Sequence, residues 1–177
     1  MTSDAFLEAC GRVLSDPRAV ELASVCASPI EPTDGVHEAA AAALGPTARA
    51  WAERVDHVED AIVRARCART GRDPEPYLRR PQGIRVDVLE AVARAFDAPD
   101  PGVRERALDA LRWRLADELA ATQPAGFAAL FARAVQLRLA ARRVAWNVDA
   151  GWAALEAALR HLEPPVLGPE SGGVTRA

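Results

Sequence analysis

The sequence contains no lysine, so its 22 basic residues are all arginines, and 25 acidic residues give a net charge of −3. The arginines are interleaved with the acids along the chain rather than gathered in one segment. Nucleic-acid binding needs a clustered basic patch and usually an excess of positive charge. We therefore expect no nucleic-acid partner.

Cysteine is scarce, and Cys10, Cys26 and Cys67 are too widely spaced for a zinc knuckle or a redox motif. Three isolated small apolar side chains are typical of a reducing cytoplasm. The first residues, MTSDAFLEACGRVL, lack the basic stretch of a secretory signal. No apolar run approaches the roughly 20 residues that cross a bilayer. We expect a cytoplasmic protein without membrane insertion, although it could lie at the periphery of a membrane complex.

Aromatic residues are few, with four Trp, four Phe and one Tyr, and alanine supplies much of the apolar content. A composition rich in alanine and charge and poor in β-branched residues favours helices. No run of four or more alternating residues predicts a strand. We predict an all-α protein, an irregular bundle of six to eight helices in a single domain over residues 1–162. The remaining tail, 163–177, has too little apolar content to order itself.

Proline, glycine and acidic caps divide the chain into helices. Asp16–Pro17 and Asp100–Pro101 have the pattern of helix starts, and Gly71 that of a helix end. We predict one helix that begins after Ser3 and one that begins at Asp16. Further helices are predicted over 36–44, 47–70, 84–96, 101–121 and 124–146, and a last one follows Asp149. Because the segment 124–146 has the least polar surface, we expect it to be the central helix.

Apolar residues spaced three and four apart predict the buried face of each helix. The predicted inward positions are Phe6, Cys10, Val13 and Leu14; Trp51, Val55, Val58, Ile62 and Ala65; Val88, Leu89, Val92 and Phe96; Leu108, Leu111, Leu115 and Leu119; Phe127, Leu130, Ala134, Leu137, Ala141 and Val144, widened by Phe131, Val135 and Leu139; and Trp152, Leu155, Leu159 and Leu162.

Trp113 lies nearly opposite the leucine stripe of helix 101–121 and is surrounded by small residues. Two interpretations remain open: the helix is packed on two sides within its own bundle, or Trp113 faces a partner protein. Trp and Arg are favoured anchors of protein interfaces. The candidate interface residues are Trp51, Arg112, Trp113, Arg138 and Trp146.

The densest group of ionisable residues is the segment ERVDHVED, with Glu53, Asp56, His57, Glu59 and Asp60. A carboxylate-bridged metal site in a helical bundle needs a Glu-x-x-His on each of two helices, and that pattern is absent. We predict a solvated helix face, on which Asp60 pairs with the arginine four residues later.

No catalytic signature is visible. The sequence has no nucleophile elbow, phosphate loop or dinucleotide fingerprint. We predict no catalytic, cofactor-binding or metal-binding residues and therefore no enzyme. The alternative is an enzyme or a regulatory helical module whose site forms in space, for example from Glu53, His57 and a distant arginine.

Three segments in order carry a family resemblance: WAERVDHVEDAIVRARCARTGRDPEPYLR; LRWRLADEL, preceded by Arg104-Glu105; and AVQLRLAARRVAWNVDAGWAALEAAL. Together they resemble a bacterial family of uncharacterised helical proteins that are typically encoded beside V/A-type rotary ATPase subunits. The resemblance extends over roughly residues 45–160.

The chain departs from that family at three places. Glu59-Asp60 stands where an Arg-Asn pair is expected, and Arg133 stands where a tyrosine is expected. The family usually has an apolar, strand-like segment ahead of the first helix, and we expect none here. The resemblance implies a non-enzymatic accessory or stalk-associated component of a V/A-type ATPase, similar to the helical protein that caps its central stalk. Such a component is a helical protein–protein adaptor that binds no nucleotide, and its partners are the ATPase subunits.

Overall fold

The computed structural model describes residues 3–27, 45–145, 151–153 and 156. The chain divides into two compact units, Met1–Ala141 and Arg142–Ala177. All regular structure in the described residues is helical, which confirms the predicted all-α class. The predicted helix 36–44 and the tail 163–177 lie outside the described residues. The predicted domain boundary after residue 162 stays a prediction.

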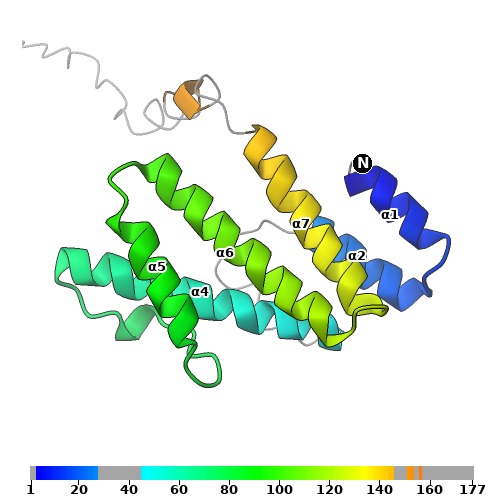
Figure 1. Cartoon of the computed structure of the whole chain (residues 1–177), viewed down its shortest axis with the longest axis horizontal. Helices are drawn as coiled ribbons and strands as arrows, with labels where there is room; N and C mark the ends of the chain where they lie inside the picture. The colour runs from blue at the N-terminus through cyan, green and yellow to red at the C-terminus, as the bar shows by residue number, and fades with distance from the viewer. Residues whose placement is uncertain (1–2, 28–44, 146–150, 154–155, 157–177) are drawn as a thin grey trace, which may run out of the picture. The chain divides into compact units, whose positions relative to one another are not determined.

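The described helices match the predicted ones in order and nearly in length (Figure 1). They are α1 (Ser3–Gly11), α2 (Asp16–Ala27), α4 (Pro46–Thr70), the short 3-10 helix η1 (Glu75–Tyr77), α5 (Val86–Asp97), α6 (Pro101–Thr122) and α7 (Phe127–Ala145). Among these described helices, none is long and apolar enough to cross a membrane.

The predicted caps determine where two of the helices begin and end. The Asp100 side chain accepts hydrogen bonds from the backbone N–H groups of Gly102, at 2.6 Å, and Val103, and so caps α6. Gly71 ends α4 in the left-handed conformation with φ of 66°, and its N–H bonds to the carbonyl of Cys67. This backbone conformation is one that glycine adopts at little cost.

One hydrophobic core joins α4, α5 and α6. The predicted inward positions meet here, and Val58 and Leu115 are completely buried. We call this cluster the α4–α5–α6 core. Its buried members are Val58, Ala61, Ile62, Val88, Val92, Ala95, Phe96, Leu108, Leu111 and Leu115.

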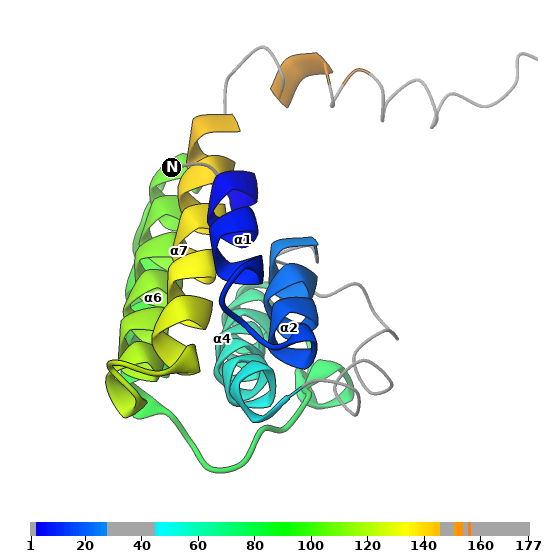
Figure 2. The same ribbon diagram turned by 90° about the vertical axis from the view of Figure 1, so that its right-hand side faces the viewer.

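A second core lies between α7 and the helices α1, α2 and α6, and the start of α4 also contributes to it (Figure 2). We call it the α6–α7 core. Its buried members are Phe6, Cys10, Leu22, Ala48, Ala116, Leu119, Phe127, Ala128, Phe131, Ala132, Ala134, Val135 and Leu139.

The buried face of α7 differs from the predicted seam. Phe131 and Leu139, which were expected only to widen the seam, lie at the centre of the observed buried face. Ala141 and Val144, which were expected to face inward, are exposed. The predicted inward position of Val13 is also wrong, because α1 ends at Gly11 and leaves Val13 in the following turn, 84% exposed. Trp152 is 61% exposed, and the other predicted inward positions of its segment, Leu155, Leu159 and Leu162, lie outside the described residues.

Helix α6 contributes to both cores, and this explains the position of Trp113. Leu108, Leu111 and Leu115 enter the α4–α5–α6 core, while Leu119 enters the α6–α7 core, against which half-buried Trp113 also packs. Of the two interpretations of Trp113, the structure supports a second packing face within the bundle. Figure 1 shows α6 between α5 and α7, so that α6, rather than the predicted 124–146 segment, is the helix shared by both cores.

Candidate functional site

A buried charged group links α6 to α4. Arg112 has a side chain only 3% exposed, and its two terminal nitrogens each lie 3.4 Å from a carboxylate oxygen, of Asp109 on α6 and of Glu59 on α4. Asp109 is fully buried. Because burying a charge without a partner is very costly, the three side chains depend on one another and fix how α4 and α6 face each other.

A second buried carboxylate holds the segment that connects α4 to α5. Asp60, 5% exposed, accepts the backbone N–H groups of Arg79 at 2.8 Å and of Arg80 at 3.1 Å. Arg80 has a φ of 59°, a conformation uncommon for a residue other than glycine. The guanidinium of Arg79 also pairs with Asp56 at 3.0 Å. The connection is therefore fastened to α4 by its backbone and by a side chain.

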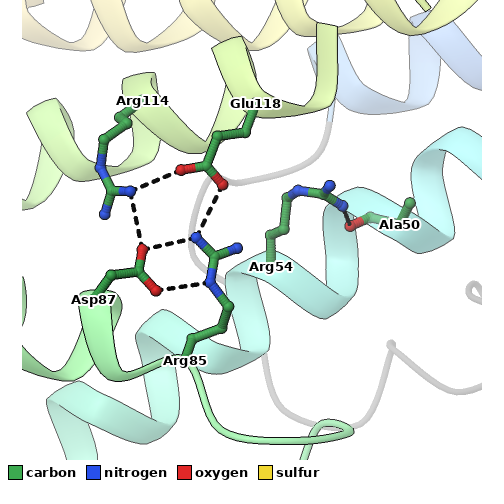
Figure 3. A network of polar contacts seen from close by, with 6 residues as sticks. All are labelled: Ala50, Arg54, Arg85, Asp87, Arg114 and Glu118. Atoms are coloured by element: carbon green, nitrogen blue, oxygen red, sulfur yellow. Dashed lines mark hydrogen bonds and ion pairs between the residues drawn. The ribbon is translucent and has the colours of Figure 1, made fainter. Parts of the chain in front are cut away.

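A ring of four charges connects the start of α5 to the C-terminal half of α6 (Figure 3). Arg85 donates to Asp87 at 2.9 and 2.7 Å and to Glu118 at 2.9 Å. Arg114 donates to the same two carboxylates, at 2.9 Å to Asp87 and 2.7 Å to Glu118. Each acid is thus shared by both arginines.

Hydrogen bonding shifts the pKa values within this ring. The bonds from Arg85, and then from Arg114, lower the pKa of Asp87 well below its usual range, although desolvation opposes the shift. The hydrogen bond to Asp87 raises the pKa of Arg85 in the same way. Both groups are therefore held in their charged forms, as favourable pairing requires.

Two guanidinium groups lie against one aromatic ring where three helices come together. Arg69 of α4 and Arg104 of α6 lie 5.3 and 4.8 Å from the ring centroid of Phe96 on α5. Arg69 also donates a hydrogen bond to the backbone carbonyl of Phe96. These contacts are within the range of cation–π attraction, and they connect the ends of α4, α5 and α6.

The prediction of a solvated face for the acidic segment is wrong for two of its residues. Asp60 is buried and binds backbone amides rather than the arginine four residues later, and Glu59 reaches Arg112. Glu53 is exposed and His57 is half-buried, and no contact described in the structure joins either of them to an arginine. Among the described residues, no group of three His, Cys, Asp or Glu side chains is placed to hold a metal ion.

The candidate interface residues occupy different environments. Half-buried Trp51 packs against both cores, and Trp113 packs against one. Arg112 is buried, so it presents almost no surface to a partner, whereas Arg138 is partly exposed. Trp146 lies outside the described residues. The structure therefore brings Trp51, Arg112 and Trp113 into the body of the bundle.

The sequence did not predict the charged ring. Its one local signal was the spacing of Arg114 and Glu118, which are four residues apart on one helix. Arg85 and Asp87 lie in another segment, and their approach to α6 depends on the way α5 packs. Such a contact cannot be read from helical periodicity.

Comparison of the chain with models of protein families, with curated proteins and with solved structures finds no match.

Proposed function

We propose that this chain is a non-enzymatic helical adaptor, an accessory or stalk-associated component of a V/A-type ATPase that resembles the helical protein capping its central stalk. The observation that supports this function best is that charged side chains of α4, α5 and α6 are paired with one another across helix interfaces. Arg112 with Glu59, and Arg85 with Glu118, are examples. These charges bind helices to helices.

Such pairing suits a mechanical part. A body that connects moving proteins must transmit force without letting its helices slide, and close packing with low compressibility provides this property. The buried pair between α4 and α6 and the ring between α5 and α6 oppose sliding at different positions along α6. Directional polar contacts specify the register between neighbouring helices more strictly than apolar packing alone does.

The proposed partners follow from the family resemblance over roughly residues 45–160. They are the subunits of a V/A-type ATPase on the cytoplasmic side of the membrane, where the chain would bind peripherally. In this role the protein binds neither nucleotide nor nucleic acid, and it acts through shape and surface chemistry. In this role Trp51 and Trp113 make the adaptor more rigid, because both side chains pack against its hydrophobic cores.

Affinity purification of the tagged chain from its native host tests the proposal. We expect ATPase subunits to be recovered together with the chain in amounts well above those from a strain carrying the tag alone. Detection of the assembled ATPase in the same lysate is the necessary control. Recovery of the chain without any of these subunits, while the ATPase is intact in that lysate, would refute the proposal.

A further inference from the structure

The connection between α4 and α5 exposes apolar side chains to solvent. Eight large apolar side chains are exposed in the part of the chain that the structure describes, and three of them, Tyr77, Ile84 and Val86, belong to this connection and the first residue of α5. Single exposed apolar residues are ordinary on protein surfaces, whereas several on one loop are typical of an interaction site. The connection is therefore a candidate contact surface.

Ile84 lacks the packing role that its position predicts. It precedes Arg85, the N-cap residue of α5, and an apolar side chain at that position often packs against the fourth residue of the helix, here Leu89. Leu89 packs against the α4–α5–α6 core, whereas Ile84 keeps 76% of its surface exposed. The stability of the fold therefore gains little from Ile84.

The loop itself is fastened at both ends. At one end, the buried carboxylate of Asp60 accepts the backbone N–H groups of Arg79 at 2.8 Å and of Arg80 at 3.1 Å. At the other end, Arg85 belongs to the charged ring that connects α5 to α6. Only the residues 81–84 lie between these anchors, and we call them the tip. A tip this short between two anchors has a defined position.

The shape of the loop suits insertion into a pocket. Both views of the fold show it projecting from the helices at the lower edge (Figures 1 and 2). Arg80 and Gly83 have left-handed backbone, with φ of 59° and 74°, and this conformation is costly for the arginine. A loop that is fixed before it binds loses little conformational entropy on binding.

The charges beside the tip are neutralised within the chain. Arg79 pairs with Asp56 at 3.0 Å, Arg80 with Glu75 at 2.8 Å, and Arg85 with Asp87 at 2.7 Å. An acidic protein surface or an anionic membrane attracts segments with an excess of positive charge, and this pairing leaves little for such a surface to attract. The remaining exposed chemistry is apolar, and its complement is an uncharged apolar pocket.

We propose that the tip is a docking loop, which inserts Ile84 into an uncharged apolar pocket of a partner protein, and that Val86 extends the contact. The identity of this partner as an ATPase subunit rests on the adaptor function proposed above. The fixed position of the loop and its contact through Ile84 can be measured whichever protein binds.

Nitrogen-15 relaxation of the full chain tests whether the loop is fixed. We expect order parameters of about 0.8 or more at the amides of Gly83 and Ile84, close to those of a rigid backbone. Asp60→Ala should lower these values, because it removes the anchor at one end, and Asp56→Ala should leave them nearly unchanged. Order parameters below about 0.6 in the unsubstituted chain would overturn the proposal.

Cross-linking in the native host tests the contact. An aliphatic amino acid with a photoreactive diazirine replaces Ile84 in one strain and, in another, Val13, which is 84% exposed in the turn after α1. We expect position 84 to cross-link to apolar peptides of one protein, identified by mass spectrometry, at least about fivefold more than position 13. No excess over position 13, or cross-links only to a second copy of the chain, would overturn the proposal. So would binding to vesicles of phosphatidylethanolamine and phosphatidylglycerol that depends on Ile84.

A matched pair of substitutions separates the docking loop from the adaptor function. Ile84→Ser should reduce the recovery of ATPase subunits about tenfold, at low and at high salt alike, and Val13→Ser should change it little. Equal recovery with both variants would mean that the adaptor function stands and the docking loop fails. If position 84 cross-links to apolar peptides of one protein that is not an ATPase subunit, the docking loop stands and the ATPase function fails.

Discussion

The guanidinium of Arg112 lies 3.4 Å from the carboxylate of Glu59, across the interface between α6 and α4. Glu59 keeps 20% of its side-chain surface exposed, whereas Arg112 keeps only 3%. Within this pair the arginine therefore bears most of the desolvation cost, and the attraction to Glu59 offsets part of that cost. The pair defines which turn of α4 faces which turn of α6.

Replacing Arg112 with alanine should destabilise the protein by about 3 kcal/mol, since it removes the cation that fully buried Asp109 depends on and leaves a cavity. Urea denaturation followed by circular dichroism measures the change. Arg94→Ala is the matched control, because Arg94 pairs with Glu90 at 3.6 Å and is 69% exposed. For Arg94→Ala we expect the free energy of unfolding to fall by less than about 0.5 kcal/mol. Equal losses in the two variants would contradict a structural role for the buried group.

Asp60→Ala should loosen the connection between α4 and α5. The substitution leaves the backbone N–H groups of Arg79 and Arg80 without their acceptor, at a cost of about 1–3 kcal/mol for each group that stays buried. Hydrogen exchange should become faster at these two amides. Asp56→Ala removes the side-chain pair with Arg79 alone and should leave amide exchange nearly unchanged. Equally fast exchange in both variants would show that the carboxylate of Asp60 is not what holds the segment.

Trp51→Ala should cost about 2–4 kcal/mol, because the indole packs against both hydrophobic cores. Trp152→Ala serves as the control, since Trp152 is 61% exposed, and its loss should change the free energy of unfolding by less than about 0.5 kcal/mol. Thermal and urea unfolding measure both. A small effect at Trp51 would mean that the two cores do not depend on the tryptophan between them.

The charged ring should contribute stability that depends on pH. The pKa of Asp87 is lowered in the folded chain, so its pairing stabilises the fold above the unfolded value of about 4 and loses this effect as the pH falls further. The ring is partly exposed, and we expect Asp87→Asn to cost about 0.5–1 kcal/mol at pH 7. Urea unfolding at pH 7, 5 and 3 should show this difference shrinking below about pH 4. A difference that persists unchanged at pH 3 would exclude the carboxylate charge as its source.

Helical periodicity and caps predicted much of the fold. Both signals are local, and Asp100 and Gly71 act at their own helix ends as expected. The buried face of α7 was harder to predict, because apolar residues occur on several sides of that helix and make several faces equally plausible. Neighbouring helices decide among such faces, and their positions are not encoded in the segment itself.

The polar contacts were the least predictable part. Asp60 was expected to pair along its own helix, but it binds a segment about twenty residues further along the chain. Glu59 likewise finds its partner on α6. A carboxylate on a helix can be solvated, can pair with a neighbour on the same helix, or can accept from a donor that is distant in the sequence. Three-dimensional packing selects among them.

Because α6 lies between two cores, its sequence has little freedom on either side. A substitution such as Leu115→Ala acts on one core and Leu119→Ala on the other, while both alter the same helix. Related chains that have diverged widely should therefore retain the apolar and charged pattern of α6 longer than that of α1 or α2. A search pattern built on this single helix would identify distant relatives more effectively than one built on the whole chain.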